Sequence, residues 1–306
     1  METLSKNNFI KVFGEEISSF VSRKIDSFDF SYEVPTPEEK DKLLLNILKT
    51  IDNPPGISGE HRIDAWEKGW GENCNEIKIA GDFNSLIPKY FGKHPYVRWQ
   101  KELIRPSSKD FEYNMAQVLQ YWLFEKYFSS VDNIYEFGCG TGHNLFRAQE
   151  INPTADIFGL DWTKASQETI FAINESFNKH FKSHNFNFFN IDYDFDLKNN
   201  SGVYTFAALE QVGNSHDDFI NYLIEKKCKV CLHIEPIGEL LDYENNLNDD
   251  LSVRYFKARN YLNSFYDYLC ELESKGKINI LQRTPSFIGS QYINGYSIVA
   301  WEPKNA

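Results

Sequence analysis

The sequence is poor in the features that mark disulfide-stabilised and membrane-spanning proteins. Its 306 residues include five cysteines at scattered positions, a sparse and odd set that is typical of reduced thiols in a cytoplasm. No apolar run approaches the roughly 18 residues that a membrane-spanning helix needs. The first residues also lack the charged and then apolar layout of a signal peptide. We therefore expect a cytoplasmic protein with no membrane partner.

Basic residues are in short supply as well. Lys and Arg number 32 against 44 Asp and Glu, which gives a formal net charge of −12. Non-specific nucleic-acid binding depends on a surplus of Lys and Arg that displaces counterions from phosphate, so we expect no nucleic-acid partner. Hydrophobic residues make up 42% of the chain. That share is enough for a buried core, in two units or in one large α/β domain.

Residues 1–108 have the pattern of an accessory region. Apolar residues between positions 8 and 22 recur at roughly helical spacing. The segment Thr36-Pro37-Glu38-Glu39 is typical of a capped helix start, and Asn53-Pro54-Pro55-Gly56 ends that helix. Residues 56–108 show no clean period, so we expect loops and short helices there. The prediction is a mainly helical and irregular region that covers the substrate site.

Near residue 109 the pattern changes to short apolar runs that alternate with helices. An amphipathic helix is expected over residues 109–129. We expect strands at 133–137, 157–160, 185–191, 203–209, 229–234, 278–281 and 296–301, and helices from about 143, over 165–174 and over 249–275. Alternating strands and helices predict a mostly parallel sheet. The final pair has no helix between its strands, which predicts an antiparallel last strand in an α/β domain spanning 109–306.

The most informative segment joins the first of these strands to the helix that follows. It reads Glu136-Phe137-Gly138-Cys139-Gly140-Thr141-Gly142-His143, an acid followed by glycines at alternate positions. Glycine permits a tight turn and lets a ligand approach the backbone closely. The next strand ends in Asp161, where a carboxylate can accept hydrogen bonds from both hydroxyls of a ribose. The two features together predict a nucleoside-binding turn.

The glycine spacing decides between two kinds of nucleotide-binding fold. A dinucleotide fingerprint, G-x-G-x-x-G, would need its third glycine where His143 stands. The segment instead resembles motif I of the class I S-adenosylmethionine (SAM)-dependent methyltransferases, and the resemblance extends over residues 110–306. It implies a Rossmann-like methyltransferase sheet, SAM as cofactor and S-adenosylhomocysteine as product. It also implies cofactor contacts from Glu136, Gly138, Gly140, Gly142, Asp161 and Asp192. A plain nucleotide-binding domain is the alternative.

In that family the acceptor lies over the carboxyl ends of the fourth and fifth strands. Glu210 and Gln211 follow the fourth strand, and we predict that Glu210 lines the cofactor pocket and Gln211 the substrate pocket. His233 and Glu235 share one face of the fifth strand. An imidazole with an ordinary pKa of about 6.5 suits a general base, and Glu235 could orient it or act as the base itself. Both are the predicted catalytic residues; the competing interpretation of His233 is a buried core histidine.

Aromatic and basic residues gather in the accessory region. Trp70, Tyr90 and Arg98 lie in segments that mix tryptophan and tyrosine with Lys, His and Arg. Aromatic faces stack on sugar rings, and an Arg fork grips phosphate or carboxylate. We therefore predict that these three residues bind the substrate. The alternative is an accessory core with solvated charges.

No metal site is expected. Cys228 and Cys231 have the spacing of a metal or redox pair, but no second pair of ligands stands at a matching distance in the sequence. We therefore predict that both thiols pack as small hydrophobic groups inside a buried strand.

These patterns predict a SAM-dependent methyltransferase that O-methylates a small polar acceptor such as a sugar, a nucleotide sugar or a natural-product intermediate. The Asn/Asp-Pro-Pro-aromatic turn of many nucleobase and amide N-methyltransferases is missing after the fourth strand. N-methylation of a peptide or protein is an alternative that would need an open, acidic groove. A non-catalytic SAM-binding module is a third, in which replacing His233 would leave all function intact.

Overall fold

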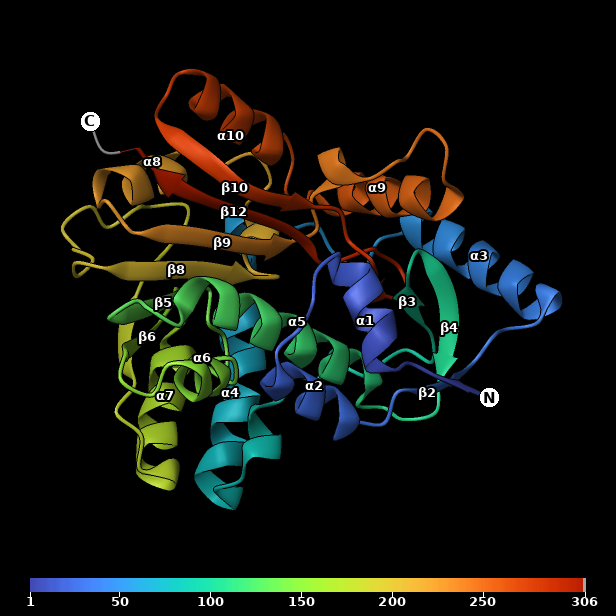
Figure 1. The fold of residues 1–306 in the computed structure, drawn as a ribbon, viewed down its shortest axis with the longest axis horizontal. Coiled ribbons are helices and arrows are strands. Elements are labelled where there is room, and N and C mark those ends of the chain that lie inside the picture. Colours follow the sequence, from blue (N-terminus) through green and yellow to red (C-terminus); the bar gives the residue numbers. More distant parts are fainter. Residues whose placement is uncertain (305–306) are drawn as a thin grey trace.

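A seven-stranded sheet forms the centre of the protein in the computed structural model, which describes residues 1–304 (Figure 1). The strands lie in the order β10-β12-β9-β8-β5-β6-β7. Their bounds are β5 (Asn133–Phe137), β6 (Asp156–Asp161), β7 (Lys182–Asn185), β8 (Ser201–Phe206), β9 (Val230–Glu235), β10 (Ile278–Thr284) and β12 (Ser297–Pro303). Pairing is parallel from β7 to β9, and β12 is antiparallel to both of its neighbours. The predicted α/β class and the antiparallel last strand are confirmed.

The strand order reverses beside β5, and this reversal positions the site. From β5 the chain moves outward through β6 to β7, and then returns to β8 on the other side of β5. Connections that leave neighbouring parallel strands in opposite directions open a crevice at the carboxyl ends of those strands. The crevice therefore lies at the ends of β5 and β8.

Helices cover both faces of this sheet. One face packs against α5 (Phe111–Phe128), α6 (Leu145–Ile151) and α7 (Lys164–Phe177), and the other against α8 (Asp217–Glu225) and α10 (Phe265–Ser274). Alternation along β5 explains the two cores, since Ile134 faces the first group of helices and Tyr135 the second. The helix expected over 109–129 is confirmed as α5, but most of its surface is buried. Its outer side contacts the accessory region, where the Trp122 ring stacks on Phe13 with centroids 4.0 Å apart.

The accessory region is mainly helical, as predicted. Its helices are α1 (Lys6–Phe13), α2 (Ser19–Asp26), α3 (Pro37–Asp52) and α4 (Ile63–Ala80). Thr36 caps α3 with the expected capping box. Gly14 has φ +71° and ends α1, so the expected helix over 8–22 is two helices. Loops and short helices were expected over 56–108, but α4 is a long helix, which packs along α7, a contact that its own periodicity does not show.

A second sheet, which the sequence did not predict, joins the accessory region to the methyltransferase-like part. Its order is β1 (Glu2–Thr3), β2 (Ser31–Glu33), β4 (Glu102–Pro106), β3 (Val97–Trp99) and β11 (Ile288–Ser290). The strands are too short to show alternation in the sequence. Because β11 lies between β10 and β12 in the chain, the sheet crosses the boundary expected at residue 108.

Two further elements differ from expectation. The third strand is Lys182–Asn185, three residues earlier than predicted, and residues 186–191 form a loop with aromatic side chains. The long helix expected over 249–275 is divided into α9 (Leu247–Arg259) and α10. Asn260 (φ +53°) and Ser264 (φ +57°) take left-handed conformations between them. The apolar residues of the two helices pack in different places: Val253 and Phe256 of α9 join a small cluster with Leu241 and Tyr261, whereas Leu269 of α10 packs in the core on one face of the central sheet.

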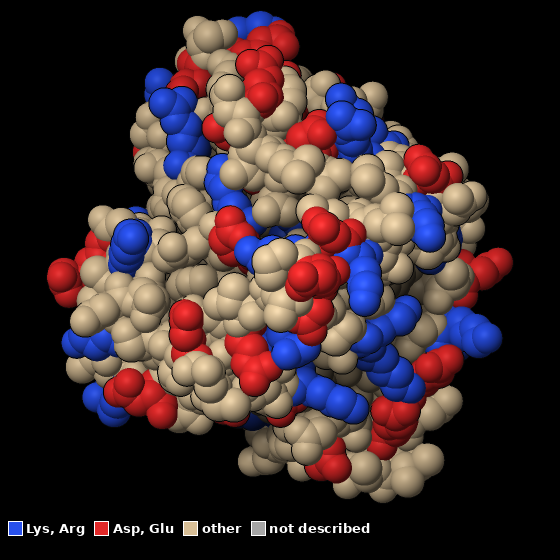
Figure 2. Space-filling view, turned by 90° about the vertical axis from the view of Figure 1, so that its right-hand side faces the viewer, with Lys and Arg blue, Asp and Glu red and all other residues tan. Residues whose placement is uncertain are grey.

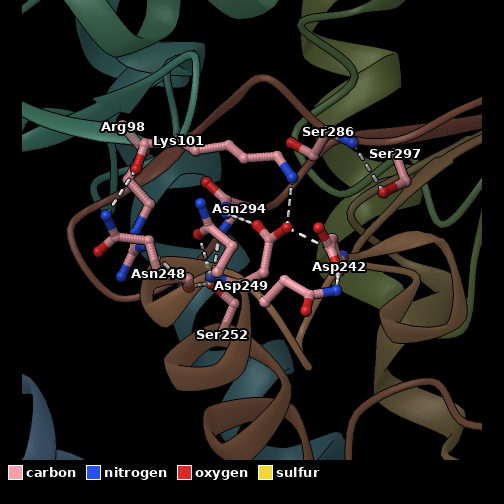
Figure 3. Close-up of polar contacts among 11 residues, drawn as sticks. Arg98, Lys101, Asp242, Asn248, Asp249, Ser252, Ser286, Asn294 and Ser297 are labelled. Carbon is pink, nitrogen blue, oxygen red and sulfur yellow. Dashed lines mark hydrogen bonds and ion pairs between the residues drawn. The ribbon is translucent and has the colours of Figure 1, made fainter.

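A buried polar network also ties the accessory region to α9 (Figure 3). The ammonium group of Lys101 lies 2.5 Å from Oδ2 of the fully buried Asp249, and Asn294 donates to Oδ1 at 2.7 Å. The backbone N–H of Asp242 donates to the same carboxylate at 2.9 Å. One charge in this network therefore comes from the β3–β4 turn, and its counter-charge from the first turn of α9.

The outer face of the accessory region carries both signs of charge. Figure 2 shows Lys and Arg interspersed with Asp and Glu over this face. Several of these side chains form exposed ion pairs, such as Arg105 with Glu33 and Glu39 at 2.6 Å each. Within residues 1–304, no helix is both long enough and apolar enough to cross a bilayer.

Candidate functional site

A cleft lies at the carboxyl ends of β5, β6 and β8, where the strand order reverses. It is narrow, with a cavity volume of about 60 Å³. It is lined by Trp66, Trp70, Gly138, Asp161, Trp162, Phe186, Phe188, Phe189, Ala207, Ala208, Gln211 and Val212. Predicted site residues from three separate segments, Gly138, Asp161 and Gln211, therefore meet here, together with Trp70 from the accessory region.

The glycine turn after β5 forms the floor of the cleft. Gly138 has φ +78°, and a Cβ there would lie 2.3 Å from the Cβ of Ala208. Gly140 has φ +52°, and a Cβ there would lie 2.9 Å from the Trp70 ring. Gly142, with φ +71°, faces side chains of α7. The turn thus needs glycine both for its left-handed conformation and for close contacts, and an indole from the accessory region covers part of it.

Asp161 connects the glycine turn to the start of α7. Its Oδ2 accepts the N–H of Gly140 at 3.0 Å, and its Oδ1 accepts both the N–H of Thr163 at 3.0 Å and the Thr163 hydroxyl at 2.7 Å. Burial raises the pKa of Asp161, and these donors oppose the shift. A carboxylate has about four acceptor positions, so Asp161 can hold the turn and still accept from a ligand in the cleft.

Glu136 lies beneath the turn and does not line the cleft. Its carboxylate accepts from Asn144 at 2.6 Å and from the Tyr204 hydroxyl at 3.0 Å. Burial raises the pKa of Glu136 to about 8. The position fits a group that acts on a ligand through the turn; direct contact with a cofactor stays a prediction.

The structure does not bring Asp192 to the cleft. Its carboxylate is partly exposed and lies 3.0 Å from Nε2 of His184, which lowers its pKa. The loop that precedes Asp192 contributes Phe188 and Phe189 to the cleft in its place. The expected adenine contact at Asp192 therefore does not fit this position.

Tryptophans supply two walls that the sequence analysis missed. Trp162, the residue after Asp161, lines the cleft with its ring centroid 5.8 Å from that of Phe189. Trp66 stacks on Trp70 at 5.2 Å. Position next to Asp161, the predicted ribose-binding acid, could have indicated Trp162. Spacing of four residues from Trp70 could have indicated Trp66 if α4 had been predicted.

Gln211 lines the cleft, and Glu210, its neighbour in the chain, is not part of the lining. Gln211 donates to Glu210 Oε1 at 2.8 Å and accepts from the Ser58 hydroxyl at 3.0 Å. Burial raises the pKa of Glu210 to about 8, and the nearby carboxylate of Glu235 adds to the shift. Ser58 belongs to the accessory region, so this region fixes the side chain of a cleft residue.

His233 is a core histidine, so the general-base role does not fit its position. The ring is fully buried, and its Nδ1 lies 3.0 Å from the Thr205 hydroxyl. Nε2 has no hydrogen-bond partner among residues 1–304. The ring packs against Phe265 with centroids 5.1 Å apart and lies close to Trp301. Burial lowers the pKa of His233 to about 3, which leaves the imidazole neutral and separated from the cleft.

Glu235 holds the segment after β8 and is not free to act on an acceptor. Its oxygens accept the backbone N–H groups of Ala208, Leu209 and Glu210, each at 3.1 Å. The side chain is fully buried, and burial raises its pKa to about 7 against the effect of these donors. The predicted catalytic role thus gives way to a positioning one, since Glu235 orients the turn that carries Glu210.

The other two predicted substrate contacts, Arg98 and Tyr90, do not line the cleft. Arg98 is fully buried in β3, where it donates to the carbonyls of Asn248 (3.1 Å, Figure 3) and Tyr292 (3.4 Å). Burial lowers its pKa to about 10. The Tyr90 side chain is 42% exposed, and its ring packs against Phe91 with centroids 4.7 Å apart.

The thiol pair packs as a hydrophobic group. Cys228 and Cys231 are buried, with their sulfur atoms 3.0 Å apart. In the described part of the chain, no group of three or more His, Cys, Asp or Glu side chains is arranged to hold a metal ion.

Several solved methyltransferases have a similar fold. An O-methyltransferase of neocarzinostatin biosynthesis, solved with SAM and 2-hydroxy-5-methyl naphthoic acid, is 14% identical with a TM-score of 0.42, over 79% of this chain and 70% of its own. The SAM-dependent methyltransferase SibL is 12% identical with a TM-score of 0.45, over 99% and 90%. Magnesium protoporphyrin IX methyltransferase from Synechocystis PCC 6803 is 11% identical with a TM-score of 0.46, over 62% and 82%. No protein-family model and no curated protein matches the sequence.

The topology of the sheet itself assigns the fold. The reversal beside β5, the glycine turn after β5 and the antiparallel β12 between β9 and β10 are the arrangement expected from motif I. The chain has the Rossmann-like fold of the class I SAM-dependent methyltransferases.

Proposed function

We propose that the protein transfers the methyl group of SAM to a small polar acceptor. The observation that carries the proposal is the meeting of Gly138, Asp161 and Trp162 in one cleft at the strand-order reversal. These groups suit a nucleoside: a glycine floor admits close approach, a carboxylate accepts from ribose hydroxyls, and an indole stacks on a base. When bound, SAM supplies an electrophilic methyl group attached to sulfur.

Different residues of the cleft would bind different parts of SAM. Asp161 would hold the ribose, with the N–H of Gly140 keeping its carboxylate in place. Trp162, which lines the cleft, would stack on the adenine. Trp66 also lines the cleft, and its indole N–H is buried without a partner among residues 1–304, so it is available to an acceptor atom of a ligand.

Glu210 replaces His233 as our candidate for the group that takes the proton of the acceptor. It follows β8, adjoins the cleft residue Gln211 and has a pKa raised to about 8, mainly by burial. A base with such a pKa is stronger than an ordinary carboxylate and still partly ionised near neutral pH. This chemistry suits O-methylation of a sugar, a nucleotide sugar or a natural-product intermediate.

An amine acceptor is the second candidate, favoured by the carboxylates beside the cleft. Glu210 accepts from the cleft residue Gln211, and Glu235 accepts the N–H of Glu210. Acidic groups so close to the cleft favour a ligand with a cationic nitrogen. Methyl-labelled SAM, incubated in parallel with hydroxyl and amine acceptors of matched size, separates the two candidates by the class that takes up label.

Calorimetric titration with S-adenosylhomocysteine tests the cofactor assignment. Wild-type protein is expected to bind, and Asp161→Ala to bind about tenfold or more weakly, because the variant loses the ribose acceptor and the contact to Gly140. Asp192→Ala is the matched control, since Asp192 lies outside the cleft, and its affinity should equal that of the wild type. Absence of binding by the wild-type protein would reject the proposed function.

A further inference from the structure

Helix α4 of the accessory region places two tryptophans against the cleft. Trp66 and Trp70 are one turn apart, with ring centroids separated by 5.2 Å and planes 29° apart. Both line the cleft, opposite the strand ends that supply Gly138 and Asp161. The Trp70 ring also contacts the glycine turn at Gly140. Residues far from motif I in the sequence therefore contribute directly to the site.

Glu67, between the two tryptophans, contacts the first turn of α7. Its Oε2 accepts the N–H of Lys164 at 2.7 Å, and its Oε1 accepts the N–H of Ala165 at 3.0 Å. The first N–H groups of a helix have no partner within the helix, and a carboxylate there also interacts favourably with the helix dipole. Glu67 thus caps α7 from another element.

The cap adjoins the ribose-binding acid. Thr163, the N-cap residue of α7, donates its N–H to Asp161, and its hydroxyl lies 3.4 Å from the N–H of Ser166. The first three N–H groups of α7 are therefore satisfied by two side chains, one from Thr163 and one from Glu67. The contact of Glu67 with α7 and the hydrogen bonds that hold Asp161 therefore both involve the start of α7.

A second contact joins the last turn of α4 to the second turn of α7. Lys78 lies 2.8 Å from Glu168, and both side chains are 45% exposed. An exposed ion pair of this kind contributes about 0–1 kcal/mol. It supplies a matched comparison, because it links α4 to α7 without approaching the cleft.

We propose that α4 forms part of the cofactor site and that Glu67 is a positioning residue, which holds Trp66 and Trp70 over the cofactor by capping α7. The inference rests on the proposed function, since the ligand it concerns is SAM. It assigns the accessory helix to cofactor binding, whereas the sequence assigned Trp70 to the substrate. A cofactor in the cleft would then contact α4 as well as the glycine turn.

Calorimetric titration with S-adenosylhomocysteine of wild type, Glu67→Ala, Glu67→Gln and Lys78→Met tests this role. We expect Glu67→Ala to weaken binding about tenfold. Glu67→Gln keeps one oxygen that can accept an N–H, so it should lose less than about threefold. Lys78→Met should match the wild type. Hydrogen exchange adds a readout of position: the ligand should slow exchange of α4 amides in the wild type, and much less in Glu67→Ala.

The outcomes separate this inference from the proposed function. If the wild type binds and Glu67→Ala binds equally well, or Lys78→Met loses as much, the positioning role is rejected while the cofactor assignment stands. If the wild type does not bind, the cofactor assignment itself is rejected. Should Glu67→Ala fail to fold, as judged by circular dichroism, Trp66→Leu takes its place. That variant leaves the cap intact, and unchanged affinity for the ligand would overturn the proposal.

Discussion

At the scale of single residues, the buried carboxylates of Glu235 and Glu210 differ in the hydrogen-bond donors that they accept from. Three backbone N–H groups occupy Glu235, which makes it a support for the turn after β8. Glu210 accepts from the side chain of Gln211 and keeps further acceptor positions. Both residues lie at the ends of β8 and β9. Their different hydrogen bonds are therefore what makes Glu235 a positioning group and Glu210 a candidate base. The same reasoning removes His233, whose ring has one hydrogen-bond partner among residues 1–304, the Thr205 hydroxyl.

The role of Glu210 predicts a pH dependence. Its pKa is raised to about 8, mainly by burial, so the carboxylate form that can accept a proton increases as the pH rises through that value. With a labelled acceptor, kcat should rise between about pH 7 and 9 and then level off. Glu210→Gln should lower kcat roughly 100-fold and abolish the rise.

Binding of S-adenosylhomocysteine by Glu210→Gln provides the control and should stay within a factor of about two. If the variant shows the wild-type pH profile, another group takes the proton. A replacement at His233 is expected to change stability without altering that profile.

At the scale of elements, the break between α9 and α10 comes from the backbone conformation of the residues between them. The apolar pattern of the sequence does not mark it. Asn260 ends α9 with φ +53°, and its amide donates to the carbonyl of Ser58 at 3.1 Å. The N–H of Ser58 donates back to the carbonyl of Arg259 at 2.8 Å. The end of α9 is therefore joined to the accessory segment that also orients Gln211.

The left-handed conformation of Asn260 predicts a difference between two substitutions. Asn260→Ala and Asn260→Gly both remove the amide contact to Ser58, but only glycine adopts this conformation without a steric penalty. We expect the alanine variant to be less stable than the glycine variant by about 1 kcal/mol. Urea denaturation of both proteins measures the difference. Equal stability would show that the backbone at this position is not strained by a Cβ atom.

At the scale of the whole molecule, one buried charge pair links three segments far apart in the sequence. Asp249 is fully buried and receives Lys101 from the β3–β4 turn and Asn294 from the β11–β12 link. Lys101 has φ +69°, a conformation that costs a non-glycine residue about 1–2 kcal/mol. The ion pair between Lys101 and Asp249 therefore forms although Lys101 must adopt an unfavourable backbone conformation, so tertiary contacts compensate for this cost.

Removing Lys101 should destabilise the protein strongly. Lys101→Met removes the ammonium group that is paired with the buried carboxylate of Asp249, which costs about 3 kcal/mol or more. Lys40→Met is the control, because Lys40 forms an exposed pair with Glu102 at 3.4 Å and should change stability by less than about 1 kcal/mol. Thermal unfolding measures both. Equal midpoints for the two variants would contradict a structural role for the network.

The sequence by itself determined the central fold and the cofactor turn, because both rest on local patterns. Glycines at alternate positions after Glu136 and an acid at the end of the next strand specify a turn and its ligand chemistry within a short stretch of chain. The expected strand alternation, the antiparallel last strand and the helix over 109–129 follow from periodicities that the core enforces.

The acceptor side was decided by the tertiary structure. Whether His233 faces the core or the cleft depends on helices packed from elsewhere in the chain, as do the short strands of the second sheet and the position of α4. The roles proposed for Trp66 and Glu67 depend on the packing of α4 along α7. Such contacts join residues that are far apart in the sequence. The local pattern of an element does not show which distant segment will pack against that element.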